Sequence, residues 1–143
     1  HFGSKAAAQT AGQQLCSSVS VSQLCWGREN AELWANENLA QREVDMIIGA
    51  DIVVPLFYCT DSLVETILVL AGERTKLVLA VKHRGGEELA HAFNAFYSTL
   101  RQYFASVDVI DATNSLIQHP QNDFKIVRAS GFQHDTRTEH QKC

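Results

Sequence analysis

The sequence predicts one α/β domain with a doubly wound, mostly parallel sheet in three layers. Apolar runs of strand length alternate with helix-forming segments, which is the order of a parallel sheet with crossover helices. The run 45–54 is almost continuously apolar, as in strands buried on both faces, and 75–83 is predicted to be the next buried strand. Two further strand-like segments, 107–112 and 124–129, have no helix between them, which predicts an antiparallel terminal hairpin.

The N-terminal part of the chain gives weaker signals. Residues 1–17 are rich in Ala, Gln and Ser, and we interpret them as a tail or the end of a preceding helix. Residues 18–26 alternate valine with serine before they turn apolar, which predicts a strand. The segment 28–43 is weakly amphipathic, so it remains open between a short helix and a surface loop.

Two helices are predicted between and after the apolar runs. Ser62 and Glu65 have the spacing of a capping box, and Gly72 would end the helix that follows. The second helix, 87–104, carries one apolar stripe. Its members are Leu89, Ala92, Phe93, Phe96, Leu100 and Phe104.

Composition excludes several classes of protein. The chain has 143 residues, of which 45% are hydrophobic, and a formal net charge of −4. This is a globular composition without the basic cluster of a nucleic-acid binder, and no apolar run could cross a membrane. The four cysteines form no C-x-x-C motif and no metal site. We expect reduced, mostly buried thiols, such as Cys25 and Cys59, in an intracellular, cytoplasmic protein.

Three motifs in order carry a family resemblance. They are "LCWG" at 24–27, "DMIIGADIVV" at 45–54 and "VETI" at 64–67, followed by the strand exit "LVLAVKHR" at 77–84. Over residues 18–130 the chain resembles the C-terminal half of a class I, S-adenosylmethionine-dependent methyltransferase. The likeness is to the lysine-methyltransferase-like group called methyltransferase family 16, and it implies a Rossmann-like methyltransferase fold.

The resemblance assigns roles to four residues. Trp26 would lie beside the adenine of the cofactor, Gly27 would allow close backbone approach, and Ala50 would pack against the cofactor. Asp51, at the end of the central strand, would be the catalytic residue that meets the substrate. Each has a structural alternative: a core tryptophan, a turn glycine, a small core residue and a turn-forming aspartate. Val54 stands where the family has tyrosine, which weakens the case for lysine methylation.

A cofactor-binding element of the family is missing. No G-x-G sequence occurs in the chain, although a glycine-rich turn would hold the methionine portion of the cofactor. We therefore expect residues 18–132 to be the C-terminal half of the domain, with the N-terminal cofactor half absent and 133–143 a polar tail. The open edge of the 45–54 strand then needs the missing half, a partner chain or a second copy to cover it.

The function expected from the resemblance is methyl transfer from S-adenosylmethionine to a protein side chain such as lysine. The alternative is a non-catalytic, methyltransferase-like scaffold or binding subunit, which Val54 and the missing glycine turn favour for this chain. A nucleotide-binding domain of another family is a weaker alternative, because no phosphate loop is present.

Overall fold

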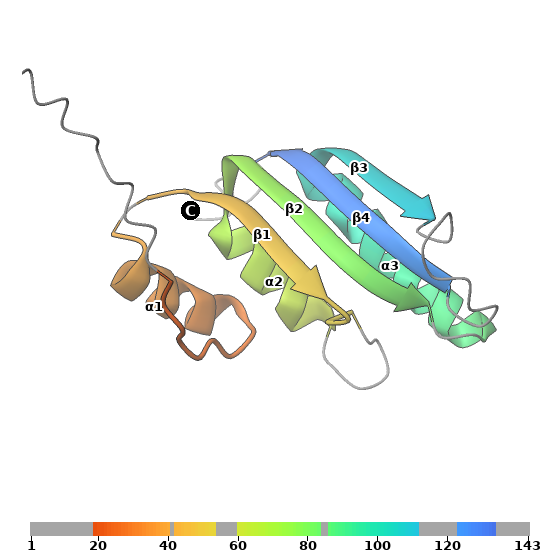
Figure 1. The fold of residues 1–143 in the computed structure, drawn as a ribbon, viewed down its shortest axis with the longest axis horizontal. Coiled ribbons are helices and arrows are strands. Elements are labelled where there is room, and N and C mark those ends of the chain that lie inside the picture. The colour runs from red at the N-terminus through yellow and green to blue at the C-terminus, as the bar shows by residue number, and fades with distance from the viewer. Residues whose placement is uncertain (1–18, 41, 54–59, 84–85, 112–122, 134–143) are drawn as a thin grey trace, which may run out of the picture.

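The computed structural model describes residues 19–40, 42–53, 60–83, 86–111 and 123–133. These residues form three helices and four strands in an α/β arrangement (Figure 1). The elements in chain order are α1 Arg28–Asn38, β1 Val44–Ala50, α2 Thr60–Leu70, β2 Ala71–His83, α3 Glu87–Tyr103, β3 Phe104–Asp111 and β4 Asp123–Phe132.

The four strands form one mixed sheet in the order β1-β2-β4-β3. Strand β1 is parallel to β2, whereas β4 is antiparallel to both β2 and β3. Three strands therefore run in one direction and only β4 runs against them, which confirms the antiparallel terminal pair. The last strand lies between β2 and β3, so the strands are not in chain order.

One face of the sheet forms the core. All three helices lie on the same side of the sheet in Figure 1, and alternate strand residues point toward them. The buried strand residues include Leu77, Leu79, Val81 and Val127, and they pack with α2 and α3. The stripe predicted for the helix at 87–104 is confirmed in part, because Phe93, Phe96 and Leu100 of α3 are buried whereas Leu89 and Ala92 are half-buried. Phe104 is also buried, but it begins β3.

The opposite face has no helix over it in the described part of the chain. The register places Ile48, Val78, Ile126 and Ile110 on this face, and Ile48 is 73% exposed. The prediction that the 45–54 strand is buried on both faces is therefore wrong for the described residues. The physical reason is that β1 is an edge strand and only one of its faces meets a helix layer. The described residues form two layers, and the third layer remains a prediction.

The strand predicted at 18–26 is absent from the described residues 19–26. Val19 and Val21 are 92% and 96% exposed, so their alternation buries neither side chain. A strand needs the hydrogen-bonding groups of a neighbouring strand, and the described sheet offers none beside this segment. The alternation of valine and serine reflects a local preference for a strand, so it could not show that no neighbouring strand lies beside this segment in the described sheet.

The capping box predicted at the start of α2 is also wrong. The helix begins at Thr60, so Ser62 lies within it, and the Ser62 carbonyl accepts a hydrogen bond from Thr66 Oγ1 at 2.8 Å. The Glu65 carboxylate instead accepts a hydrogen bond from the backbone N–H of Arg28 at 3.3 Å. The helix does end at Leu70, shortly before Gly72.

Two expectations about the environment of the protein can be compared with the described residues. Cys25 is a free, exposed thiol, so the expectation of a buried thiol is wrong at this position. Cys16, Cys59 and Cys143 lie outside the described residues. None of the three helices is long and apolar enough to pass through a membrane.

Candidate functional site

The carboxyl end of β1 is where the sequence places its candidate catalytic residue. Because β1 and β2 are parallel, their carboxyl ends meet at one edge of the sheet, where open α/β sheets bind ligands (Figure 1). Ala50 and Asp51 lie at this edge on the β1 side, and Lys82 lies near the end of β2. The antiparallel strand β4 begins here, which adds Phe124 to the same edge.

Asp51 sits in a tight turn directly after β1. Its backbone N–H donates to the Ala80 carbonyl at 2.8 Å, which extends the β1–β2 pairing one residue beyond the strand. Its φ of 52° is in the left-handed region, which aspartate tolerates better than most residues that have a side chain. The exposed Asp51 carboxylate is thus held at the rim by a fixed backbone.

The two residues before Asp51 are small for different reasons. A Cβ on Gly49 would lie 2.4 Å from Ile52 Cδ1 and 2.9 Å from Leu79 Cδ2, so a side chain there would force the ends of these two side chains to shift. Ala50 is exposed and pairs with Ala80 on the uncovered face of the sheet. The Gly-Ala-Asp sequence therefore combines close packing, a small exposed residue and a turn.

Gly27 begins helix α1 and fastens it to α2. Its φ of 121° is rarely adopted by residues with a side chain, and its carbonyl accepts the N–H of Ala31 at 3.0 Å. The Gly27 N–H donates to Thr66 Oγ1 at 2.8 Å. This donor is already used, so Gly27 has an observed structural role at the junction of the two helices.

Trp26 is half-buried beside this junction and packs against the core cluster of the sheet and helices. Its carbonyl accepts a hydrogen bond from Asn30 Nδ2 at 3.4 Å. The partly exposed indole keeps some surface available to a planar ligand, although the packing also suits a plain core tryptophan.

Thr66 is the residue that the sequence analysis did not single out. It is only 5% exposed, and its hydroxyl accepts from Gly27 while it donates to the Ser62 carbonyl. With Glu65, it binds the consecutive N–H groups of Gly27 and Arg28. A polar residue within the "VETI" motif was the available signal, because a buried hydroxyl needs a partner.

The described interactions hold the candidate residues in two places. Ala50 and Asp51 are tied to β2 at the carboxyl edge, whereas Trp26 and Gly27 are attached to the helix layer through α2. Val54 lies outside the described residues. No group of three potential metal ligands occurs among the side chains that the structure describes.

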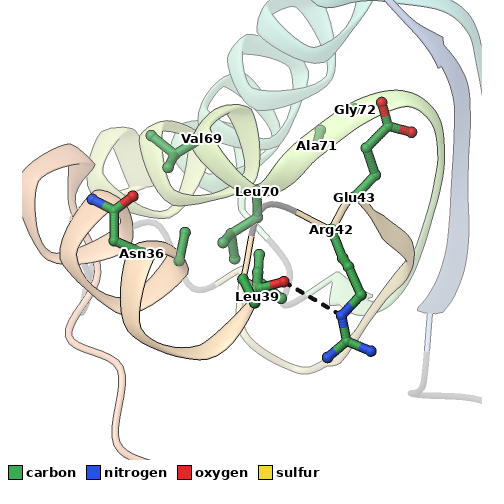
Figure 2. A pocket seen from close by; sticks show the side chains of 10 residues that line it. Asn36, Leu39, Arg42, Glu43, Val69, Leu70, Ala71 and Gly72 are labelled. Carbon is green, nitrogen blue, oxygen red and sulfur yellow. Dashed lines mark hydrogen bonds between the residues drawn. The ribbon is translucent and has the colours of Figure 1, made fainter.

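A cavity of about 630 Å³ lies at the other end of the sheet, between the ends of α1 and α2 and the starts of β1 and β2 (Figure 2). Leu39, Glu43 and Leu70 line it, and the Leu39 carbonyl accepts a hydrogen bond from Arg42 Nε at 3.4 Å. Since Val44 opens β1 and Asp51 follows its end, this cavity is separate from the carboxyl edge.

The mixed sheet, its crossover helix and the acidic turn at its carboxyl edge are consistent with an α/β domain of the methyltransferase-like kind. A family model described as lysine methyltransferase matches residues 5–102. This match covers more than half of the chain, so the protein belongs to the lysine methyltransferase family. No individual curated protein matches the chain.

Proposed function

We propose that this chain is part of an S-adenosylmethionine-dependent methyltransferase that modifies a lysine side chain of a protein. The family match supports methyl transfer. The observation that points to a site is Asp51, because its left-handed turn and the hydrogen bond from its N–H to the Ala80 carbonyl fix its backbone at the carboxyl edge of the sheet.

We propose that Trp26, Gly27 and Ala50 would contribute to the adenine side of the cofactor site. The half-buried indole of Trp26 would offer a flat aromatic surface, and Ala50 would leave room at the strand end. Gly27 would contribute close backbone approach and not its N–H, which Thr66 already binds. The absence of G-x-G from the sequence means that the methionine portion would be held by backbone other than these residues.

The sulfonium of the cofactor would supply an activated methyl group, so the protein's task is to position the acceptor nitrogen. We assign that task to Asp51, whose carboxylate would accept a hydrogen bond from the substrate amine. The bond would hold the amine at the edge beside Ala50. Val54 cannot add the hydroxyl or aromatic ring that tyrosine gives at this position in the family.

A non-catalytic scaffold is the second candidate. Two sequence observations favour it for this chain: valine at position 54 and no glycine-rich turn. Such a protein would keep the sheet and the Asp51 turn but would not bind the cofactor tightly.

We also propose that β1 is covered in the working protein. It is the edge strand of the described sheet, and Met46 and Ile48 on its outer face are exposed. Covering such side chains is worth ~1.5–3 kcal/mol each. The edge of β1 would be covered by backbone preceding this sequence in the natural protein, by a partner or by a second copy. Helices that form the third layer would cover its exposed face.

The test is a titration of S-adenosylmethionine by calorimetry, followed by transfer of labelled methyl groups to protein acceptors. Both are done with the 143-residue chain and with the natural gene product. We expect binding and lysine labelling with the gene product, and little binding with the chain alone. Asp51→Asn should lower the labelling rate at least tenfold. A gene product that neither binds the cofactor nor labels lysine would favour the scaffold, and tight binding by the chain alone would contradict the assigned division of the site.

A further inference from the structure

A groove of about 320 Å³ lies between helix α1 and the chain that leads into it. Figure 1 shows this chain, residues 19–27, passing beside α1. The indole Nε1 of Trp34 donates a hydrogen bond to Ser22 Oγ at 2.8 Å, which connects the two walls of the groove. We propose that the groove binds a basic segment of a partner protein. The proposal goes beyond methyl transfer and uses none of the residues assigned to it.

The groove has an apolar surface on the exposed side of α1. Leu24, Leu33 and Trp34 line it, and Leu33 is 63% exposed. Ala31, on the other side of the helix, is fully buried. The packing of α1 onto the rest of the protein therefore leaves the groove open. An apolar side chain of a ligand that covered Leu33 would gain the free energy of removing both surfaces from water.

The charges around the groove are mostly negative. Glu37 lines it and is exposed. Helix α1 contains three glutamates and one arginine, and the Arg28 guanidinium is paired with the Glu32 carboxylate at 3.9 Å. Residues 19–27 contain no charged side chain. A carboxylate beside an apolar surface suits lysine or arginine, because their methylene stems contact the apolar groups while the charge stays exposed.

The apolar surface continues along the chain that leads into α1. Val19 and Val21 are 92% and 96% exposed, and no backbone hydrogen bond joins residues 19–25 to another described residue. An extended peptide would supply main-chain partners to this segment and apolar side chains to the valines. A small amine would fill the groove but would leave both uncovered. We therefore assign the groove to a peptide that alternates basic and apolar residues.

The experiment uses the 143-residue chain and a fluorescent peptide that alternates lysine with leucine, with binding measured by anisotropy. The NMR signal of the Trp34 indole N–H reports whether the peptide binds at the groove. We expect Glu37→Gln to weaken binding about 2- to 5-fold through the lost ion pair. Leu33→Gln should weaken it about 3- to 10-fold through the lost apolar contact. Glu32→Gln is the matched control, because it removes the same charge from α1 outside the groove, and its affinity should change less than about twofold.

Two altered peptides test the assigned chemistry, one with glutamate for lysine and one with serine for leucine. Both should bind at least about tenfold more weakly. Equal weakening by Glu37→Gln and Glu32→Gln, or a Trp34 signal that does not move on binding, would overturn the proposal. Spermidine binding as tightly as the peptide would also overturn it, since a small amine would then suffice. The three substituted side chains are exposed, so the variants should fold. No methyl donor is present, so the result does not depend on the proposed function.

Discussion

At the scale of single residues, the Gly49-Ala50-Asp51 sequence explains why the chain can end a strand and turn within one residue. The side chains of Ile52 and Leu79 occupy the space that a Cβ at Gly49 would need, and Asp51 adopts the left-handed backbone conformation. An apolar run followed by an acidic residue could predict that Asp51 lies at a strand end. The contact between Gly49 and Ile52 could not be predicted, because it depends on the shape of the turn.

We predict that Gly49→Ala lowers the free energy of unfolding by about 1–3 kcal/mol through overpacking against Ile52. Ile52→Val removes the Cδ1 atom that a new Cβ would meet at 2.4 Å. The double substitution should therefore cost less than the sum of the two single ones. Urea unfolding of the three variants measures this, and strictly additive losses would show that the crowding is absorbed elsewhere.

Two substitutions of Asp51 distinguish the effect of its left-handed backbone on stability from the effect of its carboxylate charge. Asp51→Ala should lose about 1–2 kcal/mol of unfolding free energy, because alanine in the left-handed region is strained. Asp51→Asn should change stability little, because asparagine also tolerates this conformation. Thermal unfolding measures both. Equal losses for the two variants would mean that the carboxylate, and not the turn, provides the stability.

At the scale of elements, long-range partners decided which predicted segments form. Residues 28–38 form a helix although their amphipathic pattern is weak, because Gly27 and Arg28 are bound by Thr66 and Glu65 of α2. The segment 19–25 has a clearer strand pattern and forms no strand, since it has no neighbour in the described sheet. Local sequence predicts an element's own preference but not the partner that makes it stable.

The attachment of α1 to α2 can be tested at Thr66. Thr66→Val keeps the shape and removes the hydroxyl, which leaves the Gly27 N–H without its acceptor, so we expect a loss of about 1–3 kcal/mol. Thr66→Ser restores the hydroxyl and should recover most of that loss. Denaturant unfolding, with hydrogen exchange at Gly27, measures both effects. A valine variant as stable as the serine variant would show that the hydrogen bond does not hold the helices together.

At the scale of the whole molecule, the shared direction of β1, β2 and β3 and the antiparallel pairing of β3 with β4 agree with the expected α/β sheet. The alternation of apolar runs and helices could predict this much. The sequence could not show that one face of β1 is exposed, because a mostly apolar strand has the same sequence pattern whether or not its second face is covered. The uncovered face of β1 is clearest at Ile48, which is 73% exposed.

The central claim is that this sheet works only when other backbone covers β1. The bond from the Asp51 N–H to Ala80 implies that the amides of Ile47 and Gly49 also point toward β2, whereas those of Met46, Ile48 and Ala50 point outward. Hydrogen exchange of these amides, measured together with the mass in solution, tests this directly. We predict slow exchange of the outward amides only in an assembly larger than one 15.9 kDa chain. A single chain in which Met46, Ile48 and Ala50 exchange as slowly as Ile47 and Gly49 would contradict the claim.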